Sequence, residues 1–333
     1  MIKKVTITLF LSFYLILASL YFIFNTPWVL ERAIPFWVNS HIQEVKITVF
    51  KIGHVQFKLP GTLYFKQVKF LLADQKKEYS FDLPDVQLFL SSQKMDIKIN
   101  NVWGTGPILQ IKKASLTTKL NFVKWVMQSL SGELTIDGLD LYQYQLTNIR
   151  AKLEGDRNRI QLNDVRADFC DGSINGKIGM DYSKQMAYSI ETELTQVNLS
   201  QLKSVNPAVF SKVQGRVNGH LSIEGDIHKL HSIKSDFSAP SGGQVKASVL
   251  GYLIKYIPKS VQKDDLESLV GMNGDIPFET ADLQLESVSD RKLINKIILK
   301  SKKFDINLNL KVDINMEGGL NNLLNFYFKK LSR

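Results

Sequence analysis

The residues best suited to chemistry are few and lie far apart in this 333-residue chain. His228 and His231 stand three positions apart, a spacing that metal ligands can have, but no third His or Cys lies nearby. Asp168 and Asp171 flank a turn-like stretch, where aspartate side chains commonly bond to the backbone. Neither pair completes the ligand set that a metal ion requires, so we expect no metal site.

Motifs of the common catalytic classes do not occur in the sequence. There is no G-x-S-x-G, no phosphate-binding P-loop and no H-E-x-x-H, and the glycines between Gly172 and Gly179 follow the spacing of strands. Cys170 is the only cysteine, which leaves no intramolecular disulfide and no cysteine metal site. We therefore expect a protein that is not an enzyme and that has no cofactor.

Basic residues outnumber acidic ones mainly in the first third of the chain. Residues 1–125 carry 16 Lys and Arg against 7 Asp and Glu, whereas residues 126–333 carry 26 against 25. Nucleic-acid binding requires basic residues clustered on one helix or loop. Here they are spread singly along strand-like sequence, as Lys46, Lys51 and Lys58 are. The charge therefore predicts solvated strand faces, with attraction to anionic lipid headgroups as an addition, and no nucleic-acid partner.

The first 26 residues predict a membrane anchor. Lys3 and Lys4 precede an uncharged, apolar run over residues 5–24. A helix of that length reaches about 30 Å, the thickness of the hydrocarbon core of a bilayer. A cleaved signal peptide is the competing interpretation, but its apolar part is usually shorter and no good small-x-small cleavage site follows Ala18. With the lysine pair inside, a single pass places the bulk of the chain on the non-cytoplasmic side.

The segments after the anchor predict a helix and then strands. Residues 28–42 predict a short helix interrupted by Pro35, which either lies at the membrane surface or packs on the first strands. From residue 45 the pattern has period two, and such segments recur about every ten residues with Gly, Pro or Asx turns between them. This predicts a mainly β protein with a long, curved antiparallel sheet, one face of which is apolar and the other wet.

A few segments have the spacing of helices instead. We expect short helices over residues 121–130 and 200–211, and a terminal amphipathic helix over residues 320–331. The strongest pattern lies at residues 244–259, where a helix would cover the sheet or act as a lid over an apolar groove. The apolar side of that lid would consist of Val249, Leu253, Ile254 and Ile257.

The candidate binding residues are the apolar members of the alternating strands. Residues 153–225 repeat a short alternating strand, a Gly or Asx break and another alternating strand, and residues 304–314 alternate without exception. Such strands have one apolar face, which can form either a groove for acyl chains or an ordinary core. The groove candidates are Ile178, Met180, Ile190, Leu221, Ile223, Ile306, Leu308, Leu310 and Val312.

Residues 168–226 contain a repeating pattern. The run DFCDGSINGKIGMDYS is followed by MAYSIETELTQVNLSQL and then by VQGRVNGHLSIEGD. This succession of an aromatic turn, a strand starting with glycine, a strand ending in V-N-L, a short helix and a glycine-spaced strand resembles the repeat of the AsmA-like bacterial envelope proteins. Asp171 stands where that family commonly has glycine. The earlier run FKIGHVQFKLPGTLYFKQVKF is similar to the family's first repeat after its anchor.

The resemblance implies a β-groove of the kind found in bridge-like lipid-transfer proteins. Residues 1–26 would then be the transmembrane anchor, residues 27–131 the first β-groove repeat, and residues 132–333 the C-terminal repeats with their helices. The implied place is the inner membrane, with a single pass and the bulk of the chain in the periplasm. The implied role is to bind or conduct phospholipid for transport to, or maintenance of, the outer membrane, with other envelope proteins as further partners.

The same alternation permits a second interpretation from a different class. If the sheets fold shut on themselves as a β-sandwich, the apolar faces form an ordinary core. The protein would then be a non-enzymatic assembly or scaffold protein of the cell envelope.

Overall fold

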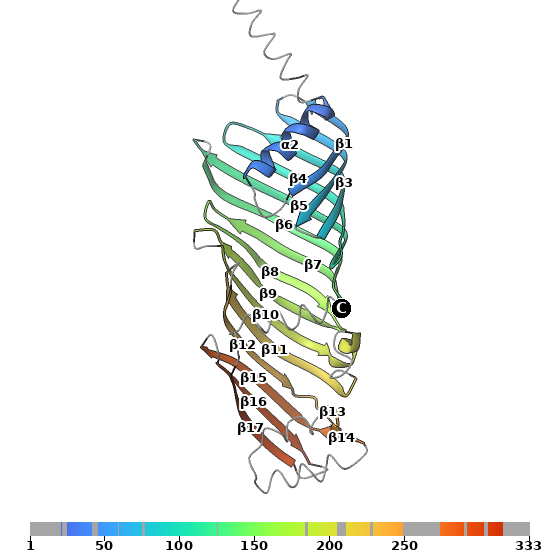
Figure 1. Ribbon diagram of the computed structural model, residues 1–333, viewed down its shortest axis with the longest axis vertical. Helices are drawn as coiled ribbons and strands as arrows, with labels where there is room; N and C mark the ends of the chain where they lie inside the picture. Colours follow the sequence, from blue (N-terminus) through green and yellow to red (C-terminus); the bar gives the residue numbers. More distant parts are fainter. Residues whose placement is uncertain are drawn as a thin grey trace, which may run out of the picture. The chain divides into compact units, whose positions relative to one another are not determined.

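The computed structural model shows a mainly β protein with two compact units, Met1–Leu141 and Tyr142–Arg333 (Figure 1). The structure describes residues 21, 25–41, 46–58, 60–74, 77–124, 126–183, 186–204, 211–226, 229–248, 274–289, 292–302 and 306–315. Among these residues, no helix is both long and apolar enough to cross a bilayer. The expected anchor over residues 1–26 lies almost entirely outside the described residues, and the expected terminal helix over residues 320–331 lies wholly outside them.

The first unit is an antiparallel meander in which each strand pairs with the next. Its strands are β1 (Lys46–Lys58), β2 (Thr62–Asp74), β3 (Lys77–Leu90), β4 (Lys94–Thr105), β5 (Leu109–Val123) and β6 (Val126–Leu141). The unit ends with β6, whereas the boundary expected after residue 131 falls inside that strand.

Cross-strand pairing gathers apolar residues on one face of this unit. One row runs from Val55 on β1 through Phe65, Val86, Ile99 and Leu116 to Leu134 on β6. Residues directly opposite one another in a sheet share a face, and successive residues alternate between faces. The neighbouring row on the other face is polar in most places, with Gln56, Tyr64, Gln87, Lys98, Thr117 and Glu133. The alternation predicted from the sequence is therefore a property of the folded sheet.

Helix α2 (Pro27–His41) covers the β1 side of the apolar face. Leu30 packs against a buried cluster of Ile52, Val55, Leu63, Phe65 and Val68. The expected helix is confirmed, but it continues through Pro35 instead of breaking there. A proline removes one backbone hydrogen bond of a helix, and this helix continues through that position while it packs on β1.

Side chains around α2 also bind the backbone of β1, whose opposite edge pairs with β2. Three N–H groups of β1 donate to side-chain oxygens: Ile47 to Asn39 at 2.8 Å, Ile52 to Glu31 at 2.7 Å, and Phe57 to Asn25 at 2.8 Å. An uncovered strand edge invites pairing with another chain. The helix therefore protects this edge as well as part of the apolar face (Figure 1).

The helix expected over residues 121–130 is wrong. Those residues form the end of β5, a turn and the start of β6, with Phe122 opposite Met127 and Val123 opposite Val126. Their apolar spacing fits one face of a helix, but it fits a tight hairpin equally well. The hairpin extends the pairing of two long strands. It therefore gives hydrogen-bond partners to backbone groups that would remain unpaired at the ends of a separate helix.

The second unit is also built from antiparallel strands. Its main sheet contains β7 (Tyr144–Gly155), β8 (Arg159–Phe169), β9 (Gly172–Asp181), β10 (Ala187–Asn198), β11 (Val213–Gly225), β12 (Leu230–Ala239), β15 (Thr280–Ser289), β16 (Lys292–Ser301) and β17 (Ile306–Asn315). Strand β12 pairs directly with β15. The intervening β13 (Gly243–Lys246) and β14 (Asp275–Phe278) pair with each other and extend from β11.

Two expected helices of this unit are described only in part. Within residues 200–211, the described helical part is η1 (Leu199–Ser204), a 3₁₀ helix. At residues 244–259, Gln244 to Lys246 belong to β13, so the helix does not start at residue 244 as expected. Ala247 and Ser248 are helical, and the rest of that segment lies outside the described residues.

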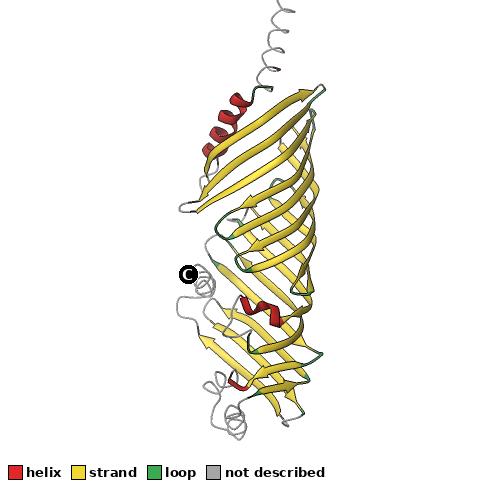
Figure 2. Ribbon diagram, turned by 90° about the vertical axis from the view of Figure 1, so that its right-hand side faces the viewer, coloured by secondary structure: helices red, strands yellow, loops and turns green. Residues whose placement is uncertain are grey.

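Bulges bend strands in both units. Positive φ values between 49° and 56° occur inside strands at Gln67, Asn101, Lys113, Asn148, Asp164 and Gln196. The pairing register shifts at all of these places except Gln67, for example between Ile99 and Val102 and between Leu162 and Val165. An extra residue in one strand bends it and increases the local twist. The strands of each unit are accordingly strongly curved (Figure 2).

Candidate functional site: an apolar sheet face

The apolar face of the second unit is organised around one aliphatic row. Leu153 on β7 pairs with Leu162, and the row continues through Ile178, Ile190, Ile223 and Ile233 on β12. Three of the predicted groove residues, Ile178, Ile190 and Ile223, are thus consecutive members of a single row. The strands bring them together although 45 positions separate the first from the last in the sequence.

The other described candidates lie in the adjacent rows. Met180 stands opposite Tyr188 and Ile160, one row away. Leu221 stands opposite Thr192 and Ser235 in the row on the other side. The face is therefore mainly aliphatic, with single hydroxyl groups between the apolar residues.

The candidates on β17 can be placed by their register. Val312 stands opposite Asn295, which stands opposite Leu285 on β15. Strand β15 in turn sets Leu285 opposite Ser235, which stands opposite Leu221. The same pairing sets Leu310 opposite Ile297, Leu308 opposite Leu299 and Ile306 opposite Ser301. By register, all the predicted groove positions belong to one face of the sheet.

Several members of this face remain accessible. Ile178 and Met180 expose 39% and 40% of their surface, although both are large apolar side chains on an interior strand. Leu230 and Leu293, by contrast, form a small buried cluster with partly buried Ile223 and Ile233 around it. An apolar strip of this kind that keeps such exposure is typical of a surface that binds another apolar molecule.

The first unit has an equivalent face that we did not select from the sequence. Its row from Val55 to Leu134 is apolar at every strand, and a second row joins Phe57, Leu63, Leu88 and Ile97. The signal was present, because the same alternation occurs in these strands. What the sequence lacked was the register that joins them.

The opposite face of the second unit is charged. Lys152 Nζ lies 2.7 Å from Asp164 Oδ2, and both side chains are exposed. A hydrogen bond and charge attraction from Lys152 lower the pKa of Asp164, and the same contact raises the pKa of Lys152. Along the same face, Lys177 stands opposite Glu191. The sheet therefore separates a wet, charged face from an apolar one.

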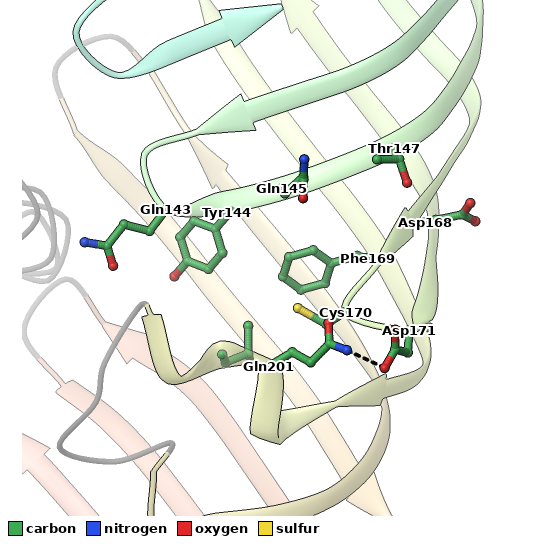
Figure 3. Close-up of a pocket in the computed structure, with 11 residues that line it drawn as sticks. Gln143, Tyr144, Gln145, Thr147, Asp168, Phe169, Cys170, Asp171 and Gln201 are labelled. Atoms are coloured by element: carbon green, nitrogen blue, oxygen red, sulfur yellow. Dashed lines mark hydrogen bonds between the residues drawn. The ribbon is translucent and has the colours of Figure 1, made fainter. Parts of the chain in front are cut away.

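A cavity of about 630 Å³ lies at one end of β7 and β8 in the second unit (Figure 3). The rings of Tyr144 and Phe169 contribute to its wall, 6.1 Å apart between centroids. Gln201 on η1 donates a hydrogen bond to Asp171, which ties that helix to the turn between β8 and β9. Sequence patterns did not reveal this cavity, because its lining comes from three segments that are joined only by the fold.

Cys170 lines the same cavity and is partly buried. Burial, followed by the charge of Asp171, raises the pKa of its thiol. A thiol with a raised pKa is mostly protonated near neutral pH and is a weak nucleophile. The environment of the only cysteine therefore does not favour nucleophilic chemistry.

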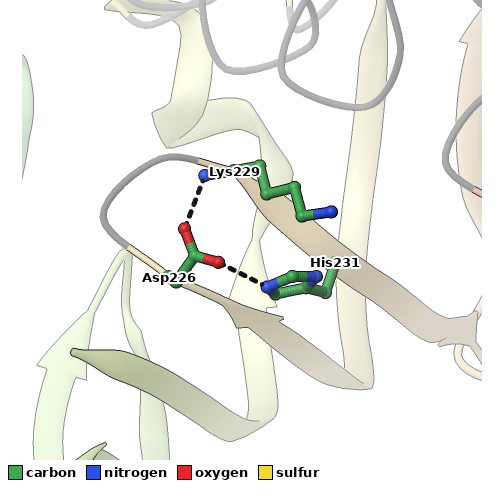
Figure 4. A network of polar contacts seen from close by, with 3 residues as sticks. All are labelled: Asp226, Lys229 and His231. Carbon is green, nitrogen blue, oxygen red and sulfur yellow. Dashed lines mark hydrogen bonds and ion pairs between the residues drawn. The ribbon is translucent and has the colours of Figure 1, made fainter. Parts of the chain in front are cut away.

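The two histidines considered as metal ligands do not form a described metal site. His231 Nε2 lies 2.7 Å from Asp226 Oδ2, and the backbone N–H of Lys229 donates to Asp226 Oδ1 at 3.0 Å (Figure 4). These contacts tie the turn between β11 and β12, while His228 lies outside the described residues. In the part of the chain that the structure describes, no group of three metal-ligating side chains occurs.

The expected lid residues Val249, Leu253, Ile254 and Ile257 lie outside the described residues. The described strands before and after that segment, β13 and β14, pair with each other, with Lys246 opposite Asp275. Their role as a lid stays a prediction.

Comparisons of the chain with protein-family models, with curated protein sequences and with solved structures found no match. The class is therefore defined by the fold itself: a mainly β protein built from open, curved antiparallel sheet with one apolar face.

Proposed function

We propose that this protein is a membrane-anchored, periplasmic lipid-binding protein, whose apolar sheet face holds or conducts phospholipid acyl chains for transport to, or maintenance of, the outer membrane. The observation that carries the proposal is the continuous aliphatic row from Leu153 to Ile233, part of which stays accessible. The anchor over residues 5–24 and the likeness to AsmA-like proteins support it. No enzymatic activity is part of the proposal.

The energetics favour acyl chains as the ligand. Each CH₂ group of a ligand that is removed from water contributes about 0.8 kcal/mol to binding. An acyl chain of many CH₂ groups can therefore bind a continuous apolar strip without any particular polar contact. Headgroups would remain at the rim, in water. Such a mode of binding distributes affinity over many residues and requires no catalytic constellation.

The closed-sandwich interpretation would require a second layer over the apolar face. The described strands of each unit form open sheet. Among the described residues of the first unit, α2 packs on the β1 side of the apolar face. Ile178 and Met180 keep exposures that a closed core would not leave them. These observations favour the groove as the basis of the proposal.

The proposal can be tested by the lipid that the full chain retains. We expect mass spectrometry of the protein, purified in mild detergent, to detect bound phospholipid. Replacing both Ile178 and Met180 by aspartate should lower the retained phospholipid at least about tenfold, since each lost apolar side chain contributes about 1.5–3 kcal/mol and 1.4 kcal/mol corresponds to a factor of ten.

Lys177 provides the matched control. It lies next to Ile178 in the chain but on the charged face, opposite Glu191. Lys177→Asp introduces the same group on the same strand and should leave the retained phospholipid unchanged. Equal retention by all three proteins, with circular dichroism showing that each is folded, would count against the groove.

A further inference from the structure

The outward stripe of α2 consists of two aromatic residues with a cation between them. Trp28, Arg32 and Phe36 follow one another at intervals of four residues, so they lie along one side of the helix. Trp28 exposes 58% and Phe36 exposes 78% of its surface. The opposite side of the helix faces the sheet, where Leu30 packs on the core and Asn39 accepts a hydrogen bond from β1.

The only charged residue of this stripe, Arg32, is positive. Arg32 Cζ lies 4.3 Å above the ring of Trp28, a cation–π contact that leaves the guanidinium at the surface. The only acidic residue of α2 is Glu31, and its carboxylate is turned inward, where it accepts the N–H of Ile52. Among the described residues Arg32 has no ion-pair partner, so the stripe combines exposed aromatic rings with a free cation there, a combination typical of helices at a membrane interface.

The sequence on the N-terminal side indicates which partner lies nearby. The apolar run over residues 5–24 ends three residues before α2 begins, and the chain between them is fixed to the sheet by the bond from Phe57 N to Asn25 Oδ1. If that run crosses a bilayer, the start of α2 cannot lie far from the lipid headgroups. Aromatic rings that pack with headgroups and a cation that attracts anionic lipid would then meet their partner directly.

We infer that the stripe formed by Trp28, Arg32 and Phe36 docks on the surface of an anionic phospholipid bilayer, so that α2 lies in the interface while its other side holds β1. This inference rests on the anchor of the proposed function, but not on the lipid groove. Docking fixes the first strands of the sheet at the membrane, where a lipid would enter or leave the apolar face.

The test places the full chain in nanodiscs of phosphatidylcholine and phosphatidylglycerol whose acyl chains are brominated near the headgroup. One protein keeps Trp28 as its only tryptophan, with Trp37, Trp103 and Trp125 changed to phenylalanine. An interfacial helix lies about 5–10 Å deep at the boundary of headgroups and acyl chains, so bromine should lower the fluorescence of Trp28 at least about twofold.

A second protein that keeps only Trp103 is the control. Trp103 lies in the same unit and is 48% exposed, but it stands opposite Asp82 on the polar face of the sheet. We expect no quenching there. In the Trp28 protein, Phe36→Asp should reduce quenching to the level of the control, whereas Phe36→Leu should preserve it.

The possible outcomes distinguish a failure of the docking inference from a failure of the membrane anchor in the proposed function. Unquenched Trp28 in a chain that alkaline carbonate does not extract from the membrane would overturn the docking inference and leave the anchor intact. Trp28 shielded from aqueous iodide but untouched by brominated lipid would mean that a second copy or another protein covers the stripe, which also overturns it. A chain that carbonate extracts, with unquenched Trp28, would overturn both the inference and the anchor.

Discussion

At the scale of single residues, the fold depends on strand positions at which the backbone has a positive φ. Most residue types found in strands do not favour that conformation. Asn101 has a φ of 56° and is exposed on β4, where the pairing with β5 shifts register. Left-handed backbone costs about 1–2 kcal/mol for most residues and little for glycine, while asparagine tolerates it better than most.

Asn101 therefore offers a test of the bulge. We expect Asn101→Val to lower the free energy of unfolding by about 1–2 kcal/mol, and Asn101→Gly to leave it unchanged or slightly higher. Chemical denaturation of the full chain in detergent micelles measures both. Equal stability of the valine and glycine variants would contradict a left-handed residue at this position.

The ion pair of Asp164 and Lys152 gives a pH-dependent prediction. Because Lys152 lowers the pKa of Asp164 in the folded protein, the pair stabilises the fold above the ordinary pKa of an aspartate. That contribution is lost as the pH falls through the lowered pKa, when the carboxylate becomes protonated. Lys152→Ala should raise the pKa of Asp164 toward its ordinary value, which carbon-detected NMR titration can follow. An unchanged titration would show that the pair does not persist in solution.

Residue patterns predicted the apolar face well and its geometry poorly. Ile178 and Ile190 could be selected because each alternates with polar neighbours, and strict alternation is the signature of a half-buried strand. That Ile178 also stands directly opposite Leu162 could not be predicted, because the register between β8 and β9 depends on the bulge at Asp164. No local rule makes an aspartate rather than a glycine adopt a positive φ at that point.

At the scale of elements, the structure shows that a helix can serve as an edge cap. Asn25, Glu31 and Asn39 supply oxygens to N–H groups of β1, as a neighbouring strand would. The sequence predicted the helix from its spacing but left open whether it packs on strands. The sequence could not show the partners of these polar side chains, because the partners are backbone N–H groups of β1.

The edge cap can be tested at Glu31. Glu31→Ala removes the acceptor of the Ile52 N–H, and leaving a partly buried donor without a partner costs about 1–3 kcal/mol. Glu31→Gln keeps an oxygen at the same reach and should retain most of the stability. We expect the midpoint of chemical denaturation to follow the order wild type, Gln, Ala. If the alanine variant is as stable as the glutamine variant, the bond to β1 contributes nothing.

The hairpin between β5 and β6 shows why elements were sometimes misassigned. Phe122, Val126 and Met127 have a spacing that fits both a helix and two paired strands. Local sequence could not decide between them, because the decision depends on whether two long strands are already paired beside it. Tertiary context outweighs a weak local preference in such segments.

At the scale of the whole molecule, the two units repeat one design. Each is an antiparallel sheet in which an apolar row runs across successive strands, at Val55 to Leu134 in the first unit and Leu153 to Ile233 in the second. The shared apolar face is the feature that bears most directly on function. Repetition of that face suits a ligand that is long and apolar rather than small and polar.

The most direct measurement is photo-crosslinking in the native membrane. A photoreactive amino acid is placed at Ile178 on the apolar face, or at its neighbour Lys177 on the charged face, in the full chain expressed in cells. We predict that irradiation joins phospholipid to the protein at position 178 and not at position 177, as mass spectrometry of the purified protein would show. Adducts at neither position, or equal adducts at both, would contradict an apolar face that carries lipid.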